Sequence, residues 1–214
     1  MNTIIDNLDG LLIRDIKTNI STAGPSPMKN NARIEIFFLG CNKAMEGNPC
    51  KGCFNETTWD NSKAEFSHDP ILLAQSINEH SNNYITIGGG EPLDQIDNLI
   101  ILCKELKKYN KNILLYTHYK LHDLLEENNK YYLKTKELLK YIDIVVDGEF
   151  IQEEKLYNEN LNDGFLNSIG SGNQIVWDIK KEYGIQMKDI ETLCLDEDNI
   201  LYMTIKGNPT IFLL

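Results

Sequence analysis

The stretch ARIEIFFLGCNKAMEGNPCKGCF, residues 32–54, joins two patterns that decide how this chain folds. Residues 32–39 are dense in β-branched and aromatic side chains and predict a buried strand that stops at Gly40. Three of the chain's five cysteines, Cys41, Cys50 and Cys53, follow directly. The strand therefore carries the first cysteine to one end of a sheet, with the other two in the loop beyond it.

Helical and strand-like patterns alternate after this loop. Asp69 and Pro70 offer an N-cap and a first-turn proline, and a later helix starts at Asp94 or Asp97. We expect helices over 69–80, 94–106, 121–128 and 131–141, and strands over 84–87, 113–117 and 142–146. This order predicts an α/β fold, an incomplete TIM-like barrel of parallel strands with helical crossovers. Ligands of such sheets sit at the carboxyl ends of the strands.

The pattern becomes β-rich after about residue 178. The runs 192–195 and 200–205 are separated by an acidic, turn-like segment, 196–199, and the chain closes on another apolar run. A hairpin or short added strands is the expected structure. We therefore divide the chain into a main domain, residues 1–178, and a β-rich C-terminal extension, residues 179–214.

The composition limits the classes of partner. The chain has 214 residues, a formal net charge of −11 and two arginines, Arg14 and Arg33. This acidic composition disfavours a protein that binds the phosphate backbone of nucleic acids. We expect no nucleic-acid partner. No apolar run reaches membrane-spanning length, and the first residues lack a basic region followed by an apolar core, so we expect a cytoplasmic protein with no membrane partner. An odd, clustered set of cysteines fits metal ligation in a reducing compartment better than disulfides.

The three clustered cysteines are candidate metal ligands. An iron-sulfur cluster held by three thiolates keeps one iron open to another ligand, as a reactive cluster requires. The alternative is a structural zinc site completed by His68 or another cysteine, but only Cys50 and Cys53 form the close pair that zinc sites usually repeat. Cys103 and Cys194 lie in helical and β-rich runs and are expected to be small buried hydrophobes.

A second candidate is the segment Gly88-Gly-Gly-Glu91-Pro92, which follows a predicted strand. By itself it suits a tight turn. Glycines also let a ligand approach the backbone, and a carboxylate accepts hydrogen bonds from an amine, so beside the cysteines a binding role is favoured. His118 and His122 have a spacing that can bind metal but show no third ligand, and we interpret them as surface histidines.

These residues carry a family resemblance. Cys50-Lys-Gly-Cys53-Phe54, together with Gly89-Gly-Glu-Pro92, resembles the radical S-adenosylmethionine superfamily, and within it the activating proteins of the anaerobic, glycyl-radical ribonucleotide reductase. The resemblance covers roughly residues 10–178 and includes Arg33 and the segments 54–59, 119–121, 143–150 and 170–174. The chain departs from the family pattern C-x3-C-x2-C, because eight residues separate Cys41 from Cys50. Turn-forming residues 47–49 allow this longer loop to bulge away and return.

The resemblance implies a cofactor set and a reaction. Cys41, Cys50 and Cys53 would hold three irons of a [4Fe-4S] cluster, and S-adenosylmethionine would chelate the fourth. Gly88, Gly89, Gly90 and Glu91 would bind the methionyl amine, Phe54 would pack near the cluster, and Asn173, in a segment near the site, would be a further cofactor-binding residue. No catalytic residue is assigned beyond the cluster ligands.

The implied partners are the large subunit of anaerobic ribonucleotide reductase, which would receive a glycyl radical, and an electron donor such as a flavodoxin. Two other functions remain open at this point. One is a radical S-adenosylmethionine enzyme that acts on a small molecule, as deazapurine-forming members do. The other is a non-enzymatic zinc or iron-sulfur module.

Overall fold

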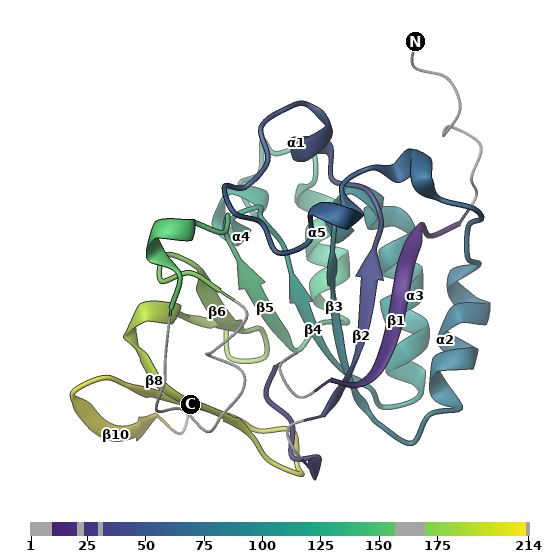
Figure 1. The fold of residues 1–214 in the computed structure, drawn as a ribbon. Coiled ribbons are helices and arrows are strands. Elements are labelled where there is room, and N and C mark those ends of the chain that lie inside the picture. The colour runs from purple at the N-terminus through teal and green to yellow at the C-terminus, as the bar shows by residue number, and fades with distance from the viewer. Residues whose placement is uncertain (1–9, 21–23, 30–31, 157–169, 213–214) are drawn as a thin grey trace.

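The computed structural model describes residues 10–20, 24–29, 32–156 and 170–212 (Figure 1). Its main feature is a seven-stranded sheet in which neighbouring strands follow chain order from β1 to β7. The strands are β1 (Ile13–Ile20), β2 (Arg33–Phe38), β3 (Tyr84–Gly89), β4 (Asn112–Tyr116), β5 (Ile144–Asp147), β6 (Ile175–Asp178) and β7 (Tyr183–Gln186).

Four central strands, β2 to β5, are parallel, which confirms the predicted α/β pattern with helical crossovers. Antiparallel strands extend this core on both sides, β1 beside β2 and β6 with β7 beside β5. The described strands thus form a mixed sheet with β1 and β7 at its edges, and closure into an incomplete barrel stays a prediction.

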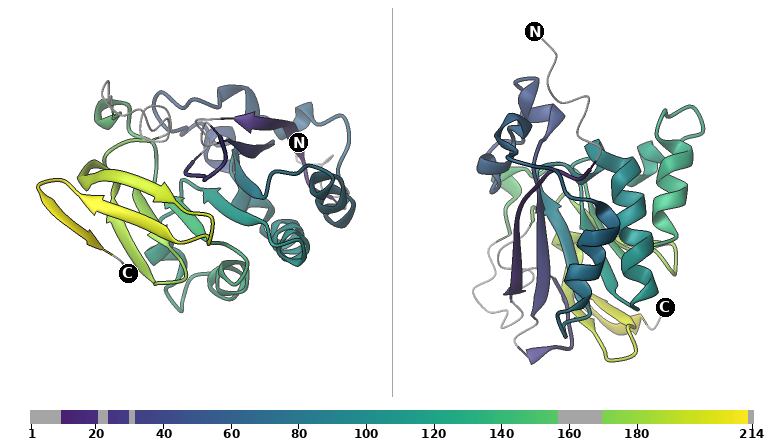
Figure 2. Two further views of the ribbon diagram at one scale, coloured as in Figure 1. Left: turned by 90° about the horizontal axis from the view of Figure 1, so that it is seen from below. Right: turned by 90° about the vertical axis from the view of Figure 1, so that its right-hand side faces the viewer.

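The crossover helices lie together on one face of the sheet (Figure 2, right). They are α2 (Pro70–Asn78), α3 (Ile96–Lys108), the short α4 (Leu121–Leu124) and α5 (Tyr132–Leu139). As predicted, the Asp69 side chain caps α2 by accepting hydrogen bonds from two first-turn amides, and Pro70 opens the helix. The other described helical elements are α1 (Asn42–Met45), η2 (Glu56–Thr58), η3 (Asn61–Lys63), η4 (Pro92–Gln95), η5 (Gln152–Glu154) and η6 (Met187–Asp189).

The opposite face is covered over β4 to β7 by a second, three-stranded sheet (Figure 2, left). It consists of β8 (Ile190–Leu195), β9 (Leu201–Ile205) and β10 (Asn208–Phe212), and the β8–β9 hairpin agrees with the predicted runs. Leu193 and Met203 from this sheet share a buried cluster with Leu114 and Val146 of the main sheet. The β-rich C-terminal segment therefore contributes to the core. Strand β7 pairs with β6, so the main sheet continues past residue 178.

Arg33, which the family resemblance includes, is fully buried at the start of β2. Its guanidinium donates to Thr86 Oγ1 at 2.9 Å and to the carbonyls of Pro25 at 2.6 Å and Ile85 at 2.7 Å. Burial lowers the pKa of Arg33 to about 10, which leaves the group charged at neutral pH. Because Cys41 follows the other end of β2, the contacts of this arginine tie strands together rather than line the cysteine site.

The carboxyl ends of β2 and β3 touch through their backbones. Phe38 stands opposite Gly89 in the parallel register, and a Cβ on Gly89 would lie 2.5 Å from the Phe38 nitrogen. A Cβ on Gly90 would lie 2.1 Å from the Gly40 oxygen. Glycine is required at both positions because the neighbouring strand occupies the space of a side chain.

We expect Gly89→Ala to destabilise the protein far more than Gly47→Ala. Both glycines have φ in the left-handed region, 100° and 84°, so both variants carry a similar backbone strain of ~1 kcal/mol. Only Gly89 has backbone atoms in the way, whereas nothing lies within 4 Å of a Cβ at Gly47. Urea unfolding should show a difference of ~3 kcal/mol between the variants. Equal unfolding midpoints would contradict the close contact of β2 and β3.

No helix among the described residues is long and apolar enough to cross a membrane.

Candidate functional site

A cavity of about 220 Å³ opens at the carboxyl ends of β2 to β5. The three clustered cysteines line it, as do Gly88, Gly89, Gly90, Glu91 and Phe54. The structure therefore brings the two sequence motifs to one place, as their positions after strands predicted. The remaining lining residues are Glu35, Asn55, Trp59, Tyr116, Thr117, His118, Gly148, Phe150 and Gln174.

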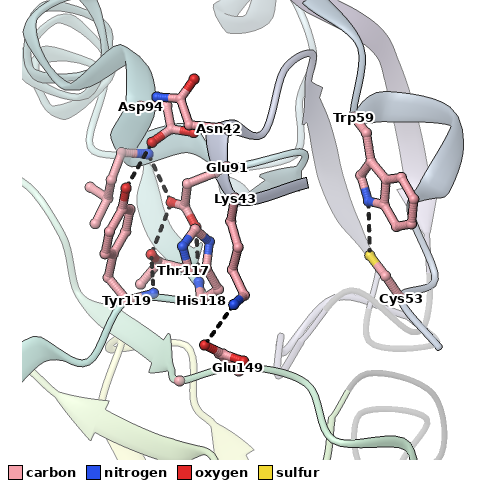
Figure 3. A network of polar contacts seen from close by, with 12 residues as sticks. Asn42, Lys43, Cys53, Trp59, Glu91, Asp94, Thr117, His118, Tyr119 and Glu149 are labelled. Carbon is pink, nitrogen blue, oxygen red and sulfur yellow. Dashed lines mark hydrogen bonds and ion pairs between the residues drawn. The ribbon is translucent and has the colours of Figure 1, made fainter. Parts of the chain in front are cut away.

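Cys41 is held by the backbone on both sides. Gly40 N donates to Thr58 O at 2.7 Å, and Cys41 N donates to Trp59 O at 3.0 Å. Asn42 N, one residue further, donates to Asp94 Oδ2 at 2.7 Å (Figure 3). Cys41 is buried as a result, while Cys50 and Cys53 are partly exposed.

Two donors point at the sulfur of Cys53. The Asn55 amide and the Trp59 indole nitrogen each lie 3.4 Å from Cys53 Sγ, and Figure 3 shows the indole contact. N–H groups directed at a sulfur stabilise its thiolate form, the form that binds iron. Trp59, which sequence reasoning did not assign to the site, is thus a neighbour of a candidate ligand.

The long gap between Cys41 and Cys50 contains a helical turn. Residues Asn42–Met45 form α1, and Gly47 then reverses the chain with a φ of 84°. The residues that this loop has beyond the C-x3-C-x2-C pattern are accommodated in α1 and the turn after it, above the strand ends in Figure 1. The loop thus bulges away from the strand ends after Cys41 and returns to the cavity at Cys50, as the turn-forming residues 47–49 predicted.

A second segment, residues 148–155, holds the cysteine loop from the other side. Lys43 Nζ lies 3.0 Å from Glu149 Oε1 (Figure 3), Lys51 pairs with Glu153, and the rings of Phe54 and Phe150 pack with centroids 4.7 Å apart. We call residues 148–155 the clasp. Its contacts fix both ends of the cysteine loop, because Lys43 lies near the first cysteine and Phe54 follows the last.

Asn173 supports the clasp and does not itself line the cavity. Its Nδ2 donates to Glu149 O at 2.9 Å, and its Oδ1 accepts from Ser171 Oγ at 2.6 Å. The neighbouring Gln174 does line the cavity and donates to Gly148 O at 2.8 Å. The segment therefore lies near the site. Cofactor binding by Asn173 stays a prediction, and the contacts that the structure shows for it hold the clasp backbone.

Glu91 is buried and accepts from four donors. Its carboxylate receives hydrogen bonds from Leu93 N, Thr117 Oγ1 and His118 N, each at 2.9 Å, and lies 2.6 Å from His118 Nδ1 (Figure 3). It therefore joins the end of β3 to the end of β4. The amide of Glu91 donates to Gly40 O at 2.7 Å, which connects the same residue to the cysteine loop.

His118 was expected at the surface, and this prediction was wrong. Its side chain is 14% exposed and lines the cavity, whereas His122 is 62% exposed and paired with Asp123, as predicted. Burial alone lowers the pKa of His118, but hydrogen bonds to Cys41 and Glu91, and their charges, raise it to about 10. A cationic imidazole thus lies between a candidate ligand and the Glu91 carboxylate. The sequence signal that could have placed it is its position just after a strand.

The structure also places the remaining cysteines and His68. Cys103 is fully buried in the helix-side core, as predicted. Cys194 is exposed, which corrects the prediction of burial, because side chains alternate along β8 and the core receives Leu193 and Leu195. His68 lines a separate pocket with Ile13 and Phe66 and is not among the residues around the cysteines.

Within the described residues, no three His, Cys, Asp or Glu side chains are grouped to hold a single metal ion. Three thiols around one cavity are the donor type of an iron-sulfur cluster, whose ligands bind different irons.

Replacing Glu91 by alanine should lower the free energy of unfolding by about 3 kcal/mol, because four buried donors lose their acceptor. Glu137 on α5, whose side chain is 40% exposed and binds Lys140 and Tyr141, is the matched control, and Glu137→Ala should destabilise the protein far less. Urea denaturation of the cluster-free protein measures both values. The same cost in both variants would refute a structural role for the Glu91 network.

Comparison with known proteins agrees with this geometry. The anaerobic ribonucleoside-triphosphate reductase-activating protein of Haemophilus influenzae is 32% identical over 153 residues, 67% of this chain and 86% of that protein. The protein of the same name from Enterobacteria phage T4 is 30% identical over 155 residues, 68% of this chain and 83% of its own. The protein of the same name from Vibrio cholerae is 29% identical over 152 residues, which are 67% of this chain and 86% of that protein.

The sequence profile of the 4Fe-4S single cluster domain matches residues 30–177, a range that contains all three clustered cysteines and the glycine segment. The chain therefore belongs to the 4Fe-4S single cluster domain family and to the family of anaerobic ribonucleoside-triphosphate reductase-activating proteins.

Proposed function

We propose that this protein is the radical S-adenosylmethionine enzyme that installs a glycyl radical on an anaerobic ribonucleotide reductase. The observation that carries the proposal is the meeting of Cys41, Cys50 and Cys53 with the segment Gly88–Glu91 around one cavity at the strand ends. A three-cysteine loop supplies ligands for three irons, and a glycine segment at a strand end offers backbone groups to a small ligand.

The cysteines, the glycine segment and the two phenylalanines each have a task in this proposal. Cys41, Cys50 and Cys53 hold the [4Fe-4S] cluster, and the Gly88–Gly90 backbone faces the amine of S-adenosylmethionine. Glu91 fixes that backbone and adds negative charge beside the amine, while Phe54 shields the cluster from water together with Phe150. When bound, the cluster supplies the electron that cleaves the sulfonium of S-adenosylmethionine, so that the resulting 5'-deoxyadenosyl radical takes a hydrogen atom from a glycine.

Further parts of the proposal concern the architecture and setting. The parallel strands β2 to β5 form the core of an incomplete barrel, and the catalytic unit spans residues 1–178, with residues 179–214 as a β-rich extension. The electron comes from a donor such as a flavodoxin, and the protein works in the cytoplasm, where thiols stay reduced.

Anaerobic reconstitution with iron and sulfide tests the ligand assignment. Alanine at Cys41, Cys50 or Cys53 should remove most of the cluster absorbance and iron, because each holds an iron of the cluster. Cys103→Ala and Cys194→Ala are the controls and should keep their iron, since one thiol is in the core and the other on an outer sheet. Full iron retention in Cys50→Ala would overturn the assignment.

Electron paramagnetic resonance tests the reaction. The reconstituted protein, mixed anaerobically with the reductase, S-adenosylmethionine and a reductant, should produce a glycine-centred radical on the reductase. The Cys50→Ala variant should produce none, because it lacks a complete cluster. If the protein cleaves S-adenosylmethionine but the reductase never gains the signal, a small-molecule substrate replaces the reductase as the target.

A further inference from the structure

Two polar side chains that line the cavity have no task in the function proposed above. Glu35 on β2 and Tyr116 on β4 both line it, together with the cysteines. Ile34 and Ile36 belong to the helix-side core, so Glu35 projects from the opposite face of the sheet, and Tyr116 shares that face with Leu114. Glu35 precedes the last residue of β2 by three positions, which places it about 10 Å along the strand from the cysteine end.

The Tyr116 side chain lacks the hydrogen-bond partner that such a buried group normally has. The Tyr116 hydroxyl is buried and has no hydrogen-bond partner among the described residues. Its pKa is raised by burial and then by the charge of Glu35, so the hydroxyl remains a proton donor. Nearly all buried polar groups in proteins are hydrogen-bonded, and an exception facing a cavity indicates that a ligand supplies the partner.

Glu35 is an acceptor in the same surroundings. No hydrogen bond to its carboxylate is found within the described part of the chain, and burial raises its pKa to about 7 despite the charge of Lys17. Lys17 stands opposite Glu35 on the edge strand β1, and its side chain is half exposed. Glu35 therefore lines the cavity on β2 and has the half-exposed Lys17 as its neighbour on the edge strand.

A glycine that receives a radical can be recognised only through its peptide groups, because it has no side chain. A peptide N–H needs an acceptor and a peptide C=O needs a donor. An acceptor from β2 and a donor from β4, on one wall of one cavity, form that complementary set. The geometry points to Glu35 and Tyr116 as the pair that binds the backbone of the partner's glycine segment beside the cofactor site. Glu35 accepts from a peptide N–H, and Tyr116 donates to a peptide C=O. This inference rests on the function proposed above.

The other ligand that could meet this pair is the ribose of S-adenosylmethionine, whose hydroxyls also donate and accept. The peptide is favoured by the position of Glu35, which lies about 10 Å down β2 from the cysteine end and opposite Lys17 of the edge strand β1. The two ligands are separated by measuring cofactor binding and reductase binding independently.

Tyr116→Phe and Glu35→Gln test the pair, because each keeps the size of the side chain and removes the hydroxyl or the charge. Tyr132→Phe and Glu137→Gln, on the outer helix α5, are matched controls. All proteins are reconstituted with the cluster and checked for iron content. Titration with S-adenosylmethionine, and its reductive cleavage with dithionite in the absence of reductase, report on the cofactor site. Glycyl-radical formation against reductase concentration reports on the peptide site.

We expect Tyr116→Phe and Glu35→Gln each to raise the half-saturating reductase concentration about tenfold. Fewer glycyl radicals should form per S-adenosylmethionine cleaved, while cofactor affinity and reductase-free cleavage stay at the control values. A parallel tenfold loss of cofactor affinity would assign the pair to the ribose and overturn the inference, as would unchanged kinetics in both variants. A wild-type protein that forms no glycyl radical would instead reject the proposed function.

Discussion

The close contact between the carboxyl ends of β2 and β3 is the constraint on which the site depends. Gly89 and Gly90 lie where a Cβ would overlap Phe38 or Gly40, and the amides of Gly90 and Glu91 donate to Phe38 O and Gly40 O. These contacts fix the glycine segment directly beside the residue before Cys41. If β2 and β3 moved apart, the two halves of the proposed cofactor site would separate, because the cysteine loop follows β2 and the glycine segment follows β3.

Glu91 extends this arrangement to a third strand. Its amide donates to Gly40 O, next to the cysteine loop, while its carboxylate accepts from Thr117 and His118 after β4. A buried carboxylate held by four donors has little freedom to move, so it defines one wall of the cavity. The cation at His118 balances this charge and touches Cys41, which links the electrostatics of the strand ends to a candidate cluster ligand.

The opposite wall comes from parts of the chain far from the cysteines in sequence. The clasp packs Phe150 on Phe54 and pairs Glu149 with Lys43, and Asn173 and Gln174 bind the clasp backbone. Strand β6, which follows Gln174, in turn shares a core with the C-terminal sheet through Val176 and Leu193. Packing of the β-rich extension is thereby connected to the position of the cysteine loop through one continuous set of contacts.

The sequence by itself determined the strand before Cys41, the cap and proline of α2, the parallel order of β2 to β5 and the meeting of cysteines with glycines. These features follow from local patterns and from the rule that parallel strands end on one side. Only the tertiary structure decided that His118 enters the cavity, that Asn173 holds the clasp and that Cys194 faces outward. It alone placed Glu35 and Tyr116 around the same cavity, and it showed that Gly89 and Gly90 are needed where the ends of β2 and β3 meet. Such properties depend on which side chains meet across separate elements, and a one-dimensional pattern does not contain those distances.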